Sequence, residues 1–254
     1  MMERAINAHK SSWSPPTNPL LLRDDEVHVW RAPLDHQALL IQKLQQTLSG
    51  DERTRAERFY FQKDRERFTV ARGLLRTILA GYLGNDPRQL RFCYSPNGKP
   101  ALVSQSGLDS LRFNVSHSHE LALIAIARGR EVGIDLECCF PQIADEYVAD
   151  RFFSRQEVAV LRALPPSVRS RVFFIYWTLK EAYVKGSREG LSIRLDHFDV
   201  SSALVGPVVL QSANGVPKQT SPWSLHTLIP GPGYVAALAA EGHDWQLRCW
   251  QWVE

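Results

Sequence analysis

Hydrophobic and polar positions along the first part of the chain predict a strand followed by two helices. Residues 26–30 alternate between polar and apolar side chains, as a half-buried strand does. A helical pattern covers residues 35–48 and ends at the Ser49-Gly50 stop signal. A second helical pattern, rich in arginine, covers residues 51–82. Its apolar residues recur at helical spacing and predict one buried stripe, which consists of Phe59, Phe68, Leu75 and Leu79.

Shorter strand patterns follow, and one of them recurs near the end of the chain. Residues 91–94 predict a strand, and residues 95–100 a turn. Two further strands, at 111–115 and 121–127, are joined by a polar connection that is predicted to be a turn. The order of strand, turn and apolar strand rich in small residues returns at 224–240. This repeat suggests that the chain consists of two related halves, and the alternative is a chance recurrence of a hairpin pattern.

These patterns together predict an α+β fold with a pseudo-two-fold arrangement. An N-terminal arm, residues 1–20, is rich in Ser and Pro and is expected to be loose or laid on the surface. The first half is expected to span residues 21–128 and the second half residues 129–254.

Composition changes this picture little, but it argues against a membrane protein and a secreted protein. The 254 residues are 44% hydrophobic and 22% charged, which is ordinary for a globular protein, and the net charge of +3 does not demand nucleic acid. The longest apolar run, 121–127, is too short to span a bilayer, and no signal-peptide stretch is present. The four cysteines form no C-x-x-C pair. We therefore expect a cytoplasmic protein with reduced thiols and with neither a membrane nor a nucleic acid as partner.

The residues with the strongest chemical signal are three acids and a lysine. Asp135 and Glu137 stand two apart on a predicted strand and therefore share a face. Glu181 and Lys185 stand four apart on a predicted helix, one turn from each other. Three carboxylates brought together would suit a hard divalent cation, Mg2+ or alternatively Mn2+, and would leave the lysine for chemistry.

The alternative is that these are surface charges. Asp135 and Glu137 could be a solvated strand end, and the helical pair an ordinary salt bridge worth about 0.3 kcal/mol. Against it, Ile134 and Leu136 make the acidic segment half-apolar, and residues 173–177 predict a buried helix. Acids on apolar elements are costly unless a cation compensates them. For His117 both roles stay open: a hydrogen-bonded structural residue or a phosphate contact.

Three segments, in this order, resemble the signature of the Sfp-type 4'-phosphopantetheinyl transferases. They are Asn-x-Ser-His at 114–117, Gly-Ile-Asp-x-Glu at 133–137 and Trp-x-x-Lys-Glu-Ala-x-x-Lys at 177–185. An Arg-Phe region at 58–59 and a Gly-Lys-Pro turn at 98–100 also resemble the family. Each segment alone is weak, whereas the set is specific.

The resemblance implies a pseudo-two-fold monomer with coenzyme A and Mg2+ in the cleft between its halves. Family members transfer the phosphopantetheine arm of coenzyme A to a serine of an apo acyl or peptidyl carrier protein and release 3',5'-ADP. We therefore expect coenzyme A as substrate, a divalent metal as cofactor and a carrier protein domain as partner.

Residue roles are implied position by position. Asp135, Glu137 and Glu181 resemble metal ligands that hold the pyrophosphate, and Glu181 also resembles the base proposed for the carrier serine. Lys185 would stabilise the departing phosphate. Coenzyme contacts are implied for Arg55, Lys99, Ser116, His117, Lys180 and Lys185.

The chain departs from the family at Glu52, where the family has a cation. This departure puts the phosphate contacts of that segment in doubt. The resemblance would place carrier docking on residues 138–147 together with Phe152 and Phe153.

Two other classes compete with the transferase. A two-metal nuclease or phosphatase would also use three acids and a lysine, and it would bind nucleic acid through the arginine-rich helix. A non-catalytic carrier-binding module would be expected to lack one of the four residues, and all four are present.

Overall fold

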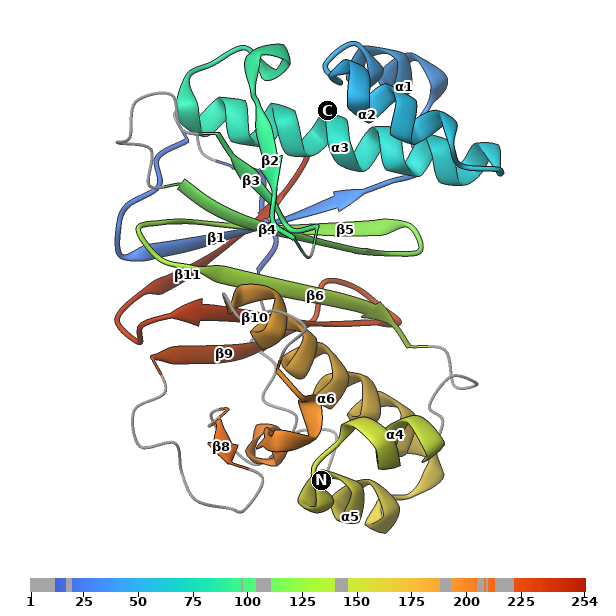
Figure 1. Ribbon diagram of the computed structural model, residues 1–254, viewed down its shortest axis with the longest axis vertical. Coiled ribbons are helices and arrows are strands. Elements are labelled where there is room, and N and C mark those ends of the chain that lie inside the picture. The colour runs from blue at the N-terminus through green and yellow to red at the C-terminus, as the bar shows by residue number, and fades with distance from the viewer. Residues whose placement is uncertain are drawn as a thin grey trace.

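Two β-sheets lie face to face in the computed structural model, each covered on its outer side by one long helix (Figure 1). The structure describes residues 12–16, 20–96, 98–103, 111–139, 146–187, 193–204, 208, 210–212 and 222–254. The first sheet has the order β11-β1-β5-β4. Its strands are β1 (Glu26–Pro33), β4 (Leu111–Ser118), β5 (Leu121–Arg128) and β11 (Gln246–Gln251).

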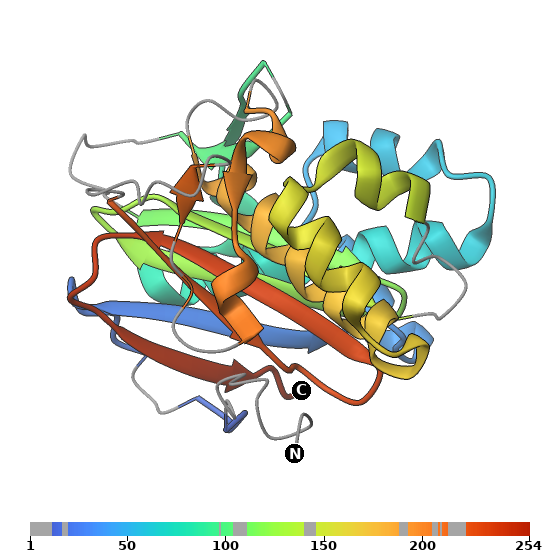
Figure 2. The ribbon, with the colours of Figure 1, turned by 90° about the horizontal axis from the view of Figure 1, so that it is seen from below.

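The second sheet has the order β6-β10-β9 and repeats the topology of the first. Its strands are β6 (Val132–Cys138), β9 (Trp223–Leu228) and β10 (Tyr234–Glu241). In both sheets the last strand of a half lies in the middle, between the other two, and all of these pairs are antiparallel. β11 is an addition that pairs in parallel with β1 at the edge of the first sheet (Figure 2). The predicted α+β fold class is therefore confirmed.

The helices fall into two groups, one for each sheet. Beside the first sheet lie α1 (Ala38–Gln45), α2 (Gly50–Glu57) and α3 (Gln62–Leu83). Beside the second sheet lie α4 (Glu146–Phe152), α5 (Arg155–Ala163) and α6 (Pro166–Gly186). Among the described residues, two further antiparallel pairs form: β2 (Phe92–Tyr94) with β3 (Pro100–Leu102), and β7 (Phe198–Asp199) with β8 (Gln211–Ser212).

The alternating side chains of β5 show how the layers are held together. Ile124 and Ile126 pack toward α3, whereas Leu123 and Ala125 pack between the two sheets. All four side chains are fully buried. A strand with both faces covered reads as a continuous apolar run, which explains the hydrophobic stretch at 121–127.

Side-chain oxygens join the two sheets where β4 runs beside β6. The oxygens of Asn114, Ser116 and Ser118 accept hydrogen bonds from the backbone amides of Ile134, Leu136 and Cys138, at 2.9, 3.2 and 3.2 Å. We call this set of contacts the β4–β6 seam. It satisfies amides that would otherwise form a bare sheet edge.

Two sequence-based boundaries were wrong, and both differences have a physical reason. The long helical pattern at 51–82 is divided between α2 and α3 because Glu52 pairs with arginines of α3 and folds α2 back onto it. The expected turn after residue 115 is instead strand up to Ser118, because the seam extends β4. Only His119, with a φ of 52°, and Glu120 make the turn.

Helix α6 crosses β6 at Gly133, and this close approach gives a prediction. A Cβ atom on Gly133 would lie 2.0 Å from the Ala182 carbonyl oxygen and 2.3 Å from the Gly186 nitrogen. Because both of those atoms are backbone, Gly133→Ala must shift the helix. We expect a loss of about 1–3 kcal/mol of unfolding free energy, measured by urea denaturation. Gly50→Ala, which meets nothing within 4 Å, should change stability little. An equal effect for both variants would contradict the packing.

Candidate active site

The acids of the predicted site extend from the β4–β6 seam. Ser116 donates to Oδ1 of Asp135 at 3.0 Å, and Ser118 donates to Oε2 of Glu137 at 3.3 Å. The same two serines accept the amides of Leu136 and Cys138. The contacts that join the sheets therefore also orient two of the three predicted acids.

Lys185 is the cation that meets the first of these acids. Its Nζ lies 2.6 Å from Oδ1 of Asp135 and 3.2 Å from Oγ of Ser116. The Asp135 side chain is 5% exposed, and its other oxygen, Oδ2, is buried without a hydrogen-bond partner. An unpaired buried carboxylate oxygen is costly and indicates a place where a cation or donor would bind favourably.

The two glutamates experience the negative charge of Asp135. Burial, and then repulsion from Asp135, raises the pKa of Glu181 above its ordinary value. Burial and the same repulsion raise the pKa of Glu137. Lys185 opposes both shifts because its positive charge favours the ionised carboxylates. The three acids therefore share one electrostatic environment in which a further positive charge would be favourable.

A divalent metal fits this environment by its chemistry. Carboxylate oxygens are the ligands that Mg2+ prefers, and Asp135 Oδ2 is a buried oxygen that lacks a partner. In the part of the chain that the structure describes, however, no three His, Cys, Asp or Glu side chains are gathered closely enough to hold a metal. The donors are present around Asp135, but they are not assembled at coordination distances.

A cleft of about 780 Å3 opens beside these residues. Its walls are the β2–β3 hairpin, the first half of β4 and the end of α6. Glu181 and Lys185 line it, and so does Tyr94 of the hairpin. The cleft thus gives a ligand access to the predicted base and to the lysine.

The cleft is also lined by a second group of charged residues. Lys99 Nζ lies 3.6 Å from Oε2 of Glu131 and donates to the Gly186 carbonyl at 3.3 Å. Nε of Arg112 lies 3.3 Å from Oε1 of Glu131. All three of these side chains belong to residues that line the cleft. Lys99, predicted from the Gly-Lys-Pro turn, therefore lies at the cleft, and Arg112 is a cation that sequence reasoning missed.

The remaining predicted contacts lie in less direct positions. His117 follows Ser116 on β4, so its side chain points to the other face of the strand. Although part of the His117 side chain is exposed, desolvation by the surrounding protein lowers the pKa of its imidazole, and the positive charge of Lys185 lowers it further. Arg55 is exposed on α2, 5.5 Å above the ring of Phe68, and does not line the cleft. Their contacts with coenzyme A stay predictions.

The prediction that Lys180 contacts the coenzyme is wrong. Its side chain is fully buried, its Nζ lies 2.9 Å from Oε2 of Glu157, and it donates to the carbonyls of Leu195 and Phe198 at 2.7 and 2.6 Å. Burial lowers the pKa of Lys180 and raises the pKa of Glu157. Because neighbouring helical residues differ by about 100° in direction, Lys180 points into the core while Glu181 faces the cleft.

The expected docking residues are only partly described. Residues 140–145 lie outside the described part of the chain. Phe153 is 3% exposed and packs on Phe173, with the ring centroids 5.1 Å apart, so it belongs to the core and is not available to a partner. Phe152 is half-buried against Trp177, at 5.9 Å between ring centroids.

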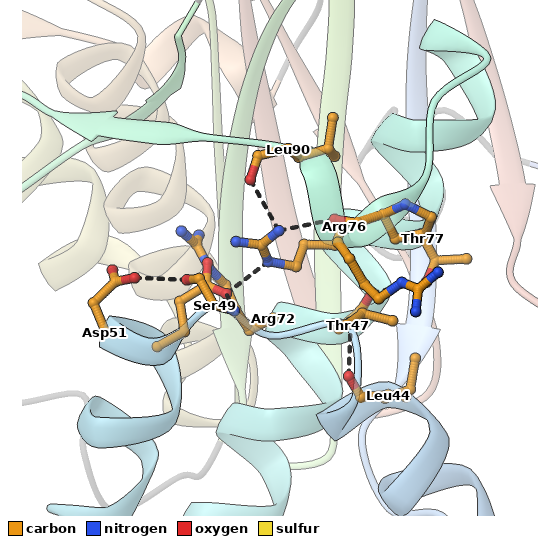
Figure 3. A network of polar contacts seen from close by, with 12 residues as sticks. Leu44, Thr47, Ser49, Asp51, Arg72, Arg76, Thr77 and Leu90 are labelled. Carbon is orange, nitrogen blue, oxygen red and sulfur yellow. Dashed lines mark hydrogen bonds and ion pairs between the residues drawn. The ribbon is translucent and has the colours of Figure 1, made fainter.

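Glu52, the departure from the family pattern, has a structural role. It closes the capping box of α2 with Ser49 and pairs with Nε of Arg72 at 2.5 Å and of Arg76 at 2.6 Å. Figure 3 shows this network, in which Arg76 also donates to the Leu90 carbonyl at 3.0 Å. Arg72 further donates to the hydroxyl of Tyr94 at 2.7 Å. The network thereby fixes one wall of the cleft to α3.

Sequence reasoning also missed the seam. Asn114, Ser116 and Ser118 stand at every second position, which on a strand places them on one face. That spacing was a signal for a polar strand face. Once residues 116–118 are assigned to a turn, however, the signal is lost.

Comparisons with known proteins agree with the geometry. Residues 131–239 match the model of the 4'-phosphopantetheinyl transferase superfamily, and residues 29–128 match the model of the 4'-phosphopantetheinyl transferase N-terminal region. The chain therefore belongs to the 4'-phosphopantetheinyl transferase superfamily. It is an enzyme of that class.

Individual relatives support this assignment over most of the chain. The chain is 43% identical over 241 residues to the 4'-phosphopantetheinyl transferase HetI of Nostoc sp. (strain PCC 7120), with 95% of this chain and 98% of the relative covered. It is 30% identical over 197 residues to the 4'-phosphopantetheinyl transferase Sfp of Bacillus subtilis (strain 168), with 78% and 84% covered. The similarity to HetI is closer than the similarity to Sfp.

Removing the charge of Lys180 should destabilise the protein strongly. Lys180→Met leaves the Glu157 carboxylate buried without its cation, and we expect a loss of about 3–5 kcal/mol in urea denaturation. Lys63→Met removes an exposed lysine whose ion pairs with Asp35 and Glu120 are both 3.7 Å long. It should change the unfolding free energy by less than about 0.5 kcal/mol. Equal losses for the two variants would show that the buried pair does not form.

Neutralising Glu181 should stabilise the free enzyme while it removes activity. Because burial and Asp135 raise the pKa of Glu181, the folded state holds its proton more tightly than the unfolded state does. This group therefore lowers stability increasingly as pH rises above its ordinary value of 4.5. Glu181→Gln should melt at a higher temperature than wild type at pH 7.

The same reasoning fixes the controls. The gain should vanish near pH 4, where Glu181 is protonated in both states. Glu57→Gln, which changes an exposed glutamate of α2, should melt like wild type at both pH values. A lower melting temperature for Glu181→Gln at pH 7 would contradict the repulsion.

Proposed function

We propose that this enzyme transfers the 4'-phosphopantetheine arm of coenzyme A to a serine of an apo acyl or peptidyl carrier protein, in a reaction that depends on Mg2+ and releases 3',5'-ADP. The observation that supports the proposal is a cleft lined by Glu181 and Lys185 together with Lys99 and Arg112, where Lys185 also contacts the buried Asp135. Coenzyme A has the matching chemistry, because its pyrophosphate and its phosphorylated nucleotide are anionic. Our proposal also includes a monomer that acts in the cytoplasm.

In the proposed reaction the serine oxygen attacks the β-phosphorus of coenzyme A. The bond between that phosphorus and the bridging oxygen breaks, and 3',5'-ADP leaves. Glu181, which lines the cleft, accepts the serine proton. Lys185, one helical turn away, stabilises the charge that develops on the leaving phosphate.

The other residues bind and orient the substrate. Asp135, Glu137 and Glu181 would hold the Mg2+ ion, which when bound neutralises charge on the pyrophosphate. Ser116 fixes Asp135, and Lys99 and Arg112 present positive charge toward the nucleotide. Contacts from Ser116 and His117 to the 3'-phosphate and the adjacent phosphate, and from Arg55 to the 3'-phosphate, remain part of the proposal.

No helix among the described residues is long and apolar enough to cross a membrane. The nuclease alternative shares the acids, but the family assignment gives it no support.

Intact-mass measurement of the carrier tests this function. Wild-type enzyme with Mg2+, coenzyme A and an apo carrier protein should add one phosphopantetheine arm to the carrier. Asp135→Asn should slow the transfer by about 100-fold or more, since it removes charge from the site. Asp150→Asn, which changes an exposed acid paired with Arg162, should retain the wild-type rate. No mass gain with any carrier type, together with cleavage of phosphodiesters, would support the nuclease instead.

A further inference from the structure

Lys185 forms an ion pair with Asp135, a carboxylate that the proposed metal site needs as a ligand. Asp135 Oδ1 receives the Lys185 ammonium at 2.6 Å and the Ser116 hydroxyl at 3.0 Å. Ser116 in turn accepts Lys185 at 3.2 Å, so lysine, serine and aspartate form a closed triangle. This oxygen of Asp135 already has two donors, while Oδ2 has none.

Lys185 is also the positive charge that offsets the neighbouring glutamates. Its charge acts on both Glu137 and Glu181, against the charge of Asp135. The three acids are not drawn together at metal-binding distances in this arrangement. The ammonium group of Lys185 therefore neutralises part of the negative charge that a bound divalent ion would neutralise.

We propose that Lys185 competes with the divalent metal for Asp135 in the free enzyme, so that the site binds metal well only after the phosphates of the substrate have drawn Lys185 away. This inference rests on the proposed function for the identity of the metal and the substrate. A divalent ion and an ammonium group on one carboxylate repel each other. The Lys185 side chain is 33% exposed and lines the cleft, so it can turn from Asp135 toward a bound anion.

The competition makes metal and substrate bind cooperatively. If coenzyme A releases Asp135 from Lys185, it raises the affinity for metal, and metal must raise the affinity for coenzyme A by the same factor. The lysine thus couples two binding events, in addition to its proposed contact with the leaving phosphate.

The test measures binding of Mn2+, as the probe metal, by the electron paramagnetic resonance signal of the free ion. Wild type, Lys185→Met and Lys185→Gln are titrated without and with coenzyme A, and a titration without protein corrects for the metal that coenzyme A itself binds. Without coenzyme A, both Lys185 variants should bind Mn2+ at least about tenfold more tightly than wild type. Coenzyme A should tighten binding to wild type by a similar factor and to the variants much less.

Two further variants separate the possible failures. Lys99→Met removes a cleft lysine that contacts Glu131, and its Mn2+ affinity without coenzyme A should equal that of wild type. Asp135→Asn should lose tight binding under all conditions. If Asp135→Asn binds Mn2+ as tightly as wild type in the presence of coenzyme A, the metal assignment in the proposed function fails. If binding depends on Asp135 but the Lys185 variants, shown to be folded by circular dichroism, bind no more tightly than wild type, the competition alone is overturned.

Discussion

The structure depends on the β4–β6 seam, where two sheets meet without pairing their backbones. Amides of an edge strand need partners, and Asn114, Ser116 and Ser118 supply them with side-chain oxygens. A backbone ladder would have merged the two sheets into one. The side-chain contacts instead keep them as two sheets that can face each other, and they leave room for acids at the join. The position of the candidate site is therefore a consequence of how the halves are joined.

The structure buries several charged side chains, and each of them would be costly to bury without a partner of opposite charge. Asp135 is buried, yet it has a serine and a lysine on one oxygen. Lys180 and Glu157, deeper in the second half, are both fully buried and fully paired. The two lysines of one helix thus have different tasks. Lys180 secures α6 within the core, whereas Lys185 lines the cleft and pairs with Asp135.

Much of this could be predicted from the sequence, because strand alternation and helical spacing report burial directly. The recurrence at 224–240 suggested two related halves without establishing them, and the two-fold arrangement was implied by the family resemblance. The acids of 133–137 were recognised from their spacing. The direction of Lys180 could not be predicted, since it depends on Glu157, a residue 23 positions away that the fold brings beside it. The break between α2 and α3 likewise depends on tertiary pairing of Glu52 with arginines of another helix.

Amide hydrogen exchange at the seam, followed by NMR in wild type and Asn114→Ala, tests the central claim most directly. Asn114 accepts the Ile134 amide, and no hydrogen bond between its side chain and the acids is found among the described residues, so the substitution removes one contact of the seam. In wild type the Ile134 amide should exchange slowly, and in the variant it should exchange at least about tenfold faster, while the amides of β6 that face β10 keep their protection. Unchanged slow exchange of Ile134 in the variant would contradict the claim that side-chain oxygens of β4 hold the two sheets together.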